Sequence, residues 1–516
     1  MGVWMDSYLK RLAKVRQQNL LGGGEDRIRQ IHQLGKLTAR ERIERILDAG
    51  TFEELGSIVT DTRPPLDGKV RPDPSEGVVM GFGKIDGRMV MLYAMDYSVM
   101  SGSLGDQAAW KLADITAMAG DRGMPLIGII DSIGERLSFK GGDAGMNGLG
   151  HLLRNYSRYS GVIPRIALLL GPCTGVFSLV PVLSDFLVIN EQTGFLWLGG
   201  DRVSDDAGTA AFHMENSGQC DMIAESDADA VDKLKTLLAY LPQNCWEKPA
   251  GVATADDTDR KEERLLDVMP DNPKFTYDMH EVIDRIVDDG EFLELKEDFA
   301  THLIIGFCRF GGRVTGIVAN NPDELSGILE PDSSDKYDRF MRFLDAFNIP
   351  LVTLVDTTAF PPGDRWERLG IIRHGAKLLH SYAHLTCPKV TMVLRRSYGG
   401  ANIVLGCSKM FPDFVYAWPT VEFAPTGPET VVHAVFHKEL EKAKSEGNYD
   451  EVYNFLLSIL KEQFSVLNLG KHWTTYYTAH EVIDPRETRP RIIKALESLD
   501  NKREQLPEKK RSIKPA

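Results

Sequence analysis

The sequence has few cysteines and no long apolar run, and both shortages exclude classes of protein. Its six cysteines among 516 residues form no CxxC pair and follow no regular spacing, so neither a disulfide framework nor a zinc ribbon is indicated. The longest apolar stretches have the length of strands, far short of the roughly 20 residues that a membrane helix needs. The N-terminus has an acid at Asp6 and no hydrophobic signal core. We therefore expect a cytoplasmic protein with reduced thiols.

Positive charge is also in short supply, because 60 Lys and Arg residues face 74 Asp and Glu residues and leave a net charge of −14. Nucleic acid is therefore not expected as a partner, since duplex affinity depends largely on phosphate neutralisation by Lys and Arg. The chain does have length and apolar content. Its 516 residues exceed one ordinary domain of roughly 100 to 200 residues, and 43% of them are hydrophobic. The composition predicts a globular protein with more than one domain.

The most informative feature is a long internal repeat. Residues 81–88, GFGKIDGR, return as GFCRFGGR at 306–313, an offset of 225 residues. Upstream, residues 42–52 match residues 282–292 at an offset of 240, so the first copy has 15 extra residues ahead of its glycine motif. The offset of 225 relates further pairs of positions: Pro125 and Pro350, Asp131 and Asp356, Gly175 and Gly400. The chain therefore contains two equivalent copies.

Each copy has the pattern of an α/β domain. Apolar runs at 126–130 and 351–355 end in an aspartate and are typical of strands buried on both faces of a sheet. They follow helical stretches at 108–118 and 337–347, so strands and helices alternate. We expect five segments: a helical entry (1–65), a first domain (66–245), a linker (246–275), a second domain (276–500) and a charged, solvated tail (501–516).

Two places in each copy combine a strand end with glycines that free backbone N–H groups. They are residues 131–136 and 171–176 in the first copy, and residues 356–363 and 396–401 in the second. Two such amides that converge on a carbonyl oxygen form an oxyanion hole, which stabilises an enolate without a charged side chain. Tight turns that close α/β units explain any single glycine pair better. The recurrence in both copies favours a functional role.

Other catalytic machinery is poorly represented. The sequence has no P-loop, no HExxH, no GxSxG and no GxGxxG that opens a βαβ unit. His213 and His374 are candidate bases. A histidine whose hydrogen bonds are satisfied within the fold, or one on the surface, explains both positions better. Four basic residues near the first glycine pair are candidates for holding nucleotide phosphates, and surface solubility explains them almost as well: Arg136, Lys140, Arg154 and Arg158.

A set of longer motifs resembles one family, over roughly residues 20 to 500. In the first half they are GKLTARER at 35–42, SGSLG at 101–105 and SGVIP at 160–164. In the second half they are SSDK at 333–336, GIIRHGAKLL at 370–379, YGGA at 398–401 and AWPT at 417–420. These motifs resemble the carboxyltransferase (beta) subunit of biotin-dependent acyl-CoA carboxylases, of the propionyl-CoA carboxylase type. They are also similar to the alpha subunits of biotin-dependent decarboxylases, such as methylmalonyl-CoA decarboxylase.

The resemblance implies two tandem crotonase-like (ClpP/crotonase β-β-α spiral) domains, the first for acyl-CoA and the second for biotin. The substrate is then a coenzyme A thioester, and no metal is expected in this subunit. Biotin would arrive on a separate carrier protein, with a biotin carboxylase or a membrane decarboxylase subunit as a further partner. The chain would form a homo- or hetero-oligomer, from dimer to hexamer. The direction of transfer stays open, as does a non-catalytic role in a mixed oligomer.

The resemblance also implies a mechanism and site residues. Carboxybiotin releases CO2, the ureido nitrogen takes the α-proton of the acyl-CoA, and the enolate attacks CO2; the reverse reaction decarboxylates a malonyl-type thioester. Amides near Gly134, Gly175 and Val176 would hold the enolate, and amides near Gly400 and Ala401 the ureido oxyanion. The further biotin-side residues are Phe360, Gly363, Tyr398, Gly399 and Ile403. The CoA-side residues are Arg136, Lys140 and Arg154.

The sequence departs from the family mainly in the acyl-CoA half. Residues 132–136 are SIGER where the family has SGGAR, and Val176 and Phe177 stand where it has Gly-Ala. A deletion shortens the stretch around 198–206. Because an amide does not depend on its side chain, we expect the oxyanion hole to survive and the acyl pocket to change shape. In the biotin half, Ile403 replaces an aspartate and gives an apolar wall.

Overall fold

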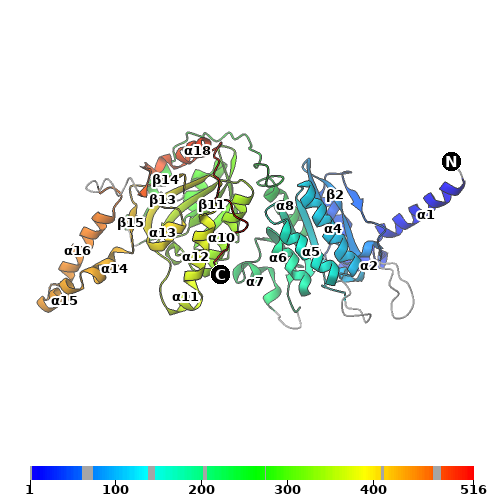
Figure 1. Ribbon diagram of the computed structural model, residues 1–516, viewed down its shortest axis with the longest axis horizontal. Coiled ribbons are helices and arrows are strands. Elements are labelled where there is room, and N and C mark those ends of the chain that lie inside the picture. The colour runs from blue at the N-terminus through cyan, green and yellow to red at the C-terminus, as the bar shows by residue number, and fades with distance from the viewer. Residues whose placement is uncertain are drawn as a thin grey trace. The chain divides into compact units, whose positions relative to one another are not determined.

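The chain forms two compact units, Met1–Lys248 and Pro249–Ala516, each with its own sheet (Figure 1). The computed structural model describes residues 3–60, 74–136, 146–200, 206–272, 275–407, 412–468 and 478–515. All six cysteines lie in these segments, and they are free, as predicted. Across the described residues, no helix combines the length and the apolar character that crossing a membrane requires.

The first unit is built on a sheet whose eight strands, within the described residues, follow the order β1–β2–β3–β4–β5–β6–β8, with β7 paired to β5. Strands β1 to β3 pair antiparallel, and the other neighbours pair parallel. Central strand β4 is buried along its whole length, as expected of a parallel strand covered on both faces. The strands are β1 (Glu53–Leu55), β2 (Val78–Ile85), β3 (Arg88–Met95), β4 (Leu126–Ser132), β5 (Arg165–Cys173), β6 (Phe186–Asn190), β7 (Phe195–Leu196) and β8 (Met222–Ala224).

Helices pack on this sheet with ends that the sequence explains. Helices α4 (Asp106–Arg122) and α5 (Met146–Arg158) lie side by side (Figure 1). Helix α3 (Ala39–Ile46) begins after a capping box of Thr38 and Glu41 and packs against α8 (Asp227–Leu238). The remaining helices are α1 (Val3–Leu20), α2 (Glu25–Gln33), α6 (Leu179–Leu183) and α7 (Ala210–Glu215).

The second unit repeats the sheet, with the order β16–β14–β13–β12–β11–β10–β9 and β15 paired to β13. Strands β9 to β11 are again antiparallel and the others parallel. The strands are β9 (Phe292–Leu295), β10 (Leu303–Phe310), β11 (Arg313–Asn320), β12 (Leu351–Thr357), β13 (Lys389–Tyr398), β14 (Phe414–Ala417), β15 (Glu422–Ala424) and β16 (Glu481–Val482).

Two groups of helices accompany the second sheet. Helices α10 (Pro331–Ala346) and α12 (Ile371–Tyr382) pack together, and α18 (Thr488–Ser498) packs on β10 and β13. A separate helical cluster buries Val432, Leu440 and Leu460 and is formed by α14 (Pro428–Val435), α15 (His437–Glu446) and α16 (Tyr449–Phe464). The remaining helices among the residues described for this unit are α9 (His280–Ile286), α11 (Asp364–Arg368) and α13 (Gly399–Val404).

The positions of the strands confirm the predicted repeat. The hairpin β2–β3 spans residues 78–95 and the hairpin β10–β11 spans residues 303–320, an offset of 225. The helix predicted at 108–118 lies within α4. The helix predicted at 337–347 begins earlier, at Pro331, because Glu330 and Ser333 form a capping box there.

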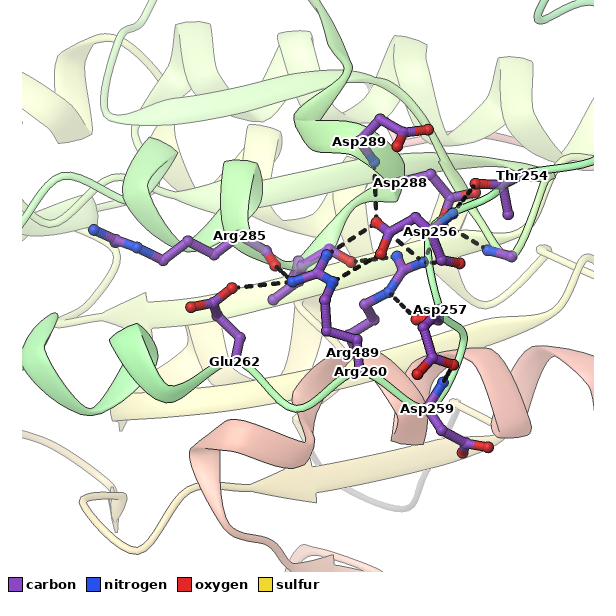
Figure 2. A network of polar contacts seen from close by, with 12 residues as sticks. Thr254, Asp256, Asp257, Asp259, Arg260, Glu262, Arg285, Asp288, Asp289 and Arg489 are labelled. Carbon is purple, nitrogen blue, oxygen red and sulfur yellow. Dashed lines mark hydrogen bonds and ion pairs between the residues drawn. The ribbon is translucent and has the colours of Figure 1, made fainter.

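The segment predicted as a linker is tied to the second unit around Arg489, which is fully buried (Figure 2). A terminal nitrogen of Arg489 lies 2.7 Å from a carboxylate oxygen of Asp288 and 3.3 Å from one of Asp256. Asp256 also pairs with Arg260 at 2.8 Å. One acidic residue of this segment, Asp256, therefore helps Asp288 to neutralise a buried arginine.

The charged tail also contacts the second unit, although we expected it to be solvated. Lys502 forms an ion pair with Asp413 at 2.9 Å, and Lys514 pairs with Asp338. Both lysines are half-buried. The expectation of a solvated tail is therefore wrong for these two residues, because acidic side chains of the unit attract them.

Candidate functional site

Gly134 and Gly175 follow the ends of two neighbouring parallel strands, β4 and β5, so their loops meet at one edge of the first sheet. Both glycines have positive φ, at 88° and 70°. Glycine adopts this conformation at low cost. A Cβ at position 134 would lie 2.7 Å from the Thr174 carbonyl oxygen, which shows that the two loops touch. The structure thus brings together the two glycine turns that the sequence singled out.

The N–H groups of these two glycines are already bonded within the unit. Gly134 donates to the Ser132 hydroxyl at 3.1 Å, and Gly175 donates to the Leu198 carbonyl at 3.1 Å. The following amides, those of Glu135 and Val176, make no hydrogen bond within the described part of the chain. An oxyanion hole at this place would therefore use the amides that follow the glycines.

A carboxylate that the sequence analysis did not select lies against the same turn. One oxygen of Glu135, Oε1, accepts the N–H of Phe177 at 2.7 Å. The other oxygen, Oε2, lies 2.0 Å from the point where a Cβ at position 175 would stand, so any residue other than glycine there would have to displace this carboxylate. The sequence did contain a signal that could have drawn attention to Glu135, since this residue is one of the departures from the family pattern.

A fully buried aspartate, Asp131, anchors the strand that leads into this site. Lys36 donates to one of its oxygens at 2.6 Å, and Arg42 donates to the other at 2.9 Å. Arg42 also pairs with Asp227 at 2.8 Å. Burial lowers the pKa of Lys36, while the charge of Asp131 acts in the opposite direction. The N-terminal segment thus supplies the cations that hold the end of β4.

The basic residues expected on the CoA side have different surroundings. Arg136 forms an ion pair with the buried Glu76 at 2.8 Å and donates to the Ser103 carbonyl at 3.0 Å. Arg154 is exposed on α5. Lys140 lies outside the described residues. In the structure, Arg136 is therefore bound to residues of the first unit itself.

The matching place in the second unit is the turn from β13 into α13. Gly399 has φ 64°, and the first amides of the helix, those of Gly399, Gly400 and Ala401, have no partner within the helix itself. Tyr398 donates its hydroxyl to Glu422. Burial, and then this contact with Glu422, raises the pKa of Tyr398.

A cavity of about 500 Å³ opens beside this turn. Phe360, Gly400 and Ile403 are among its lining residues, and the lining is mainly apolar. A Cβ at position 400 would lie 3.2 Å from the Phe360 ring. Gly363, with φ 119°, precedes α11. Three residues expected on the biotin side therefore share one cavity.

The second unit also has a buried aspartate at the end of its matching strand. Arg395 pairs with Asp356 at 2.9 Å and Arg396 pairs with it at 2.6 Å. The Arg395 guanidinium lies 5.2 Å from the centre of the Tyr277 ring. Here the cations come from the neighbouring strand β13.

Two buried lysines that occupy equivalent positions of the repeat were also not predicted from the sequence. Lys111 donates to the carbonyls of Ser75 and Val78 at 2.8 and 2.6 Å. Lys336 donates to the carbonyls of Lys296 and Phe299 at 2.9 and 2.6 Å. Burial lowers the pKa of Lys111 to about 8 and that of Lys336 to about 7. The offset of 225 relates these two lysines and was the signal that could have found them.

The two candidate histidine bases both have partners. His213 contacts the Leu196 carbonyl at 2.9 Å and the Ser217 hydroxyl at 2.7 Å. His374 contacts Asp335 at 3.0 Å. In the segments that the structure describes, no group of three or more His, Cys, Asp or Glu side chains is placed to hold a metal ion.

Comparison with known proteins gives matches along nearly the whole chain. The family described as Carboxyl transferase domain matches residues 30–513. The propionyl-CoA carboxylase carboxyltransferase subunit of Haloferax mediterranei is 38% identical and covers 98% of each chain. Methylmalonyl-CoA decarboxylase subunit alpha of Veillonella parvula is also 38% identical, over 97% of this chain and 96% of that protein.

A solved structure has the same architecture. The crystal structure of transcarboxylase 12S, described as a hexamer assembly with methylmalonyl-coenzyme A bound, matches with a TM-score of 0.93 at 36% identity. The match covers 100% of this chain and 99% of that chain.

Proposed function

The chain belongs to the carboxyl transferase domain family, and from that premise we propose that it is the carboxyltransferase subunit of a biotin-dependent acyl-CoA carboxylase. The family expected from the sequence is confirmed, and so is the fold of two tandem crotonase-like α/β domains. One observation supports the proposal above all. Both units place a glycine turn and adjacent backbone amides at matching ends of parallel strands, around Gly175 and Gly400.

The second unit fits a biotin group. Its cavity is mainly apolar, with Phe360, Ile403 and Val404 in the wall, and it borders the glycine at position 400. Such a wall suits the apolar rings and chain of biotin, and the amides of Gly400 and Ala401 are donors for the ureido oxygen. Biotin, when bound, supplies the carboxyl group that is transferred. Phe360, Gly363, Tyr398, Gly399 and Ile403 stay our proposed biotin-side residues.

The first unit would hold the acyl-CoA. The amides of Glu135 and Val176 are the donors for the thioester oxygen, beside the turns at Gly134 and Gly175. Fixed backbone donors stabilise negative charge on that oxygen without a side-chain nucleophile. We keep Arg154 and Lys140 as proposed CoA contacts. Arg136 would have to leave Glu76 to act as one.

The partners follow from the same proposal. The carboxyl group would arrive on the biotin of a carrier protein, charged by a biotin carboxylase subunit. The transcarboxylase relative is described as a hexamer, which supports an oligomer for this chain. Transfer in the direction of decarboxylation is the second candidate, because the Veillonella parvula relative is as similar as the carboxylase relative.

Purified protein with carboxylated biotin and a panel of acyl-CoA thioesters, assayed in both directions, tests the proposal. We expect transfer to at least one thioester, and the preferred thioester identifies the acyl group. Turnover that appears only after a second carboxyltransferase subunit is added would contradict it and indicate a non-catalytic subunit.

A matched pair of variants tests the assignment of the units. Ala401 and Val176 occupy equivalent positions of the repeat. Ala401→Val should slow biotin-dependent transfer and leave acyl-CoA binding unchanged, because Ala401 is fully buried and the extra methyl groups would displace the start of α13, whose amides would hold biotin. Val176→Ile should weaken acyl-CoA binding instead. Circular dichroism of both variants controls for folding, and equal effects of the two changes would count against the assignment.

A further inference from the structure

The two units differ in the side chain that covers the glycine turn. In the first unit this is Glu135, and in the second, at the offset of 225, it is Phe360. The Glu135 carboxylate lies 2.0 Å from the Cβ position of residue 175, and the Phe360 ring lies 3.2 Å from that of residue 400. The same place is therefore charged in one unit and neutral in the other.

Glu135 is bound at this place through the backbone. Its Oε1 accepts the amide of Phe177 at 2.7 Å, and Phe177 is fully buried. A hydrogen bond from an amide to a carboxylate is charge-assisted and stronger than one between neutral groups. Burial, followed by the charge of Glu135, raises the pKa of the nearby Cys173 thiol. The negative charge therefore acts on the interior of the site.

On the proposed function of the first unit as the acyl-CoA side, we infer that Glu135 determines which acyl groups bind. Its carboxylate occupies the Phe177 amide, next to the Val176 amide that the thioester oxygen would use, and so keeps the Phe177 amide from acting as a further donor. It also repels an acyl group that carries a carboxylate of its own. The site therefore prefers a thioester with a neutral acyl group, such as propionyl-CoA, over a dicarboxylic one, such as methylmalonyl-CoA.

Two substitutions separate the effect of the negative charge of Glu135 from the effect of its hydrogen bond with the Phe177 amide. Glu135→Gln keeps an oxygen that can accept the Phe177 amide and removes the charge, whereas Glu135→Ala removes both. Calorimetric titration of the intact protein with propionyl-CoA and methylmalonyl-CoA, without a biotin donor, gives the affinities. Asp114→Asn is the control, because Asp114 is an exposed carboxylate of the same unit on α4.

We expect Glu135→Gln to tighten methylmalonyl-CoA binding about tenfold and propionyl-CoA binding by less than about twofold, since the charge repulsion is removed only for the former. Glu135→Ala should tighten both, and Asp114→Asn neither. Amide hydrogen exchange at Phe177 should become faster in Glu135→Ala, which confirms that the contact exists in solution.

The results separate the inference from the proposed function. If the wild-type protein binds both thioesters and Glu135→Gln leaves the ratio of the two affinities unchanged, the inference is wrong and the proposed function stands. If neither the wild-type protein nor any variant binds a CoA thioester, both are wrong.

Discussion

Asp131 and Asp356 occupy the same position of the repeat and are both fully buried, but the two units neutralise them differently. In the first unit the cations are Lys36 and Arg42, which lie about 90 residues earlier in the chain. In the second they are Arg395 and its neighbour, on the adjacent strand. The difference teaches that the repeat fixes where a negative charge is buried, while the source of the compensating charge is free to change.

The largest expected effect comes from removing the first of these aspartates. Asp131→Ala leaves Lys36 buried without its carboxylate partner and leaves Arg42 with Asp227 alone, which should lower the free energy of unfolding by about 3–5 kcal/mol. The matching change, Asp356→Ala, should cost less, because Arg395 and Arg396 are more exposed, at 10% and 17% against 6% and 2% for Lys36 and Arg42.

Hydrogen exchange in β4 and β12 measures the two effects separately, which a single unfolding midpoint of a two-unit chain does not. Equal protection losses in the two strands would show that the source of the cations makes no difference.

The buried lysines should make the stability of the two units depend on pH in different ranges. Lys336 has its pKa lowered from 10.5 to about 7, so the folded chain releases this proton above about pH 7 while the unfolded chain retains it up to pH 10.5. The free energy of unfolding should therefore rise with pH in that window, by up to about 1.4 kcal/mol per pH unit. For Lys111 the rise should begin only at about pH 8.

Lys336→Met and Lys111→Met test this. Each should cost about 1–3 kcal/mol at neutral pH, because two buried carbonyls lose their donor. Each should also remove its own part of the pH dependence, followed by denaturant titration between pH 6 and 10 in steps of about one unit. Wild-type slopes in both variants would contradict the burial of the charge.

Substitutions in the two glycine turns should differ less in their effect on stability. Gly175→Ala should cost about 1–2 kcal/mol because φ is positive, and contact with Glu135 adds to this. Gly400→Ala should cost less than about 1 kcal/mol, since its φ is not positive and Phe360 is 3.2 Å away. Thermal unfolding measures both. Adding Glu135→Ala should recover part of the loss at position 175, and no recovery would mean that Glu135 lies elsewhere.

The smallest effect concerns a pair at the second offset of the repeat, 240. Arg40 pairs with Glu54 in the first unit, and His280 pairs with Glu294 in the second. The hydrogen bond with Glu294 is the main cause that raises the pKa of His280 to about 9. Its stabilisation is therefore complete below pH 6.5 and is lost as pH rises through about 9.

His280→Gln should cost less than about 1 kcal/mol near pH 6, since the pair is partly exposed. It should cost nothing above pH 9. Arg40→Gln should have the same cost at both values, because arginine does not titrate in this range. Stability curves at the two pH values distinguish the cases, and a pH-independent effect of His280→Gln would contradict the assigned pKa.

The sequence predicted much of the fold because its signals are local and occur twice. The apolar runs that end at Asp131 and Asp356 located β4 and β12, and the offset of 225 located the hairpins. The start of α10 was missed because Glu330 is an unusual capping residue. The contacts of the acidic segment with Arg489 could not be predicted, since they join positions more than 200 residues apart.

The candidate site was less accessible to prediction. Glycines mark a turn, but they do not show which N–H groups the turn leaves unbonded, and the amides of Gly134 and Gly175 prove to be bonded internally. The role of Glu135 depends on a hydrogen bond between its side chain and the amide of Phe177, a residue 42 positions later in the chain. Only a three-dimensional arrangement specifies such a contact.

The burial of Arg489 has a consequence for synthesis on the ribosome. The first unit ends at Lys248, so all of its strands have emerged long before the chain is complete. The second unit needs Arg489, from its last helix, to neutralise Asp256 and Asp288 near its beginning. The first unit is therefore able to fold during translation, whereas the second completes its folding only when nearly the whole chain has been released.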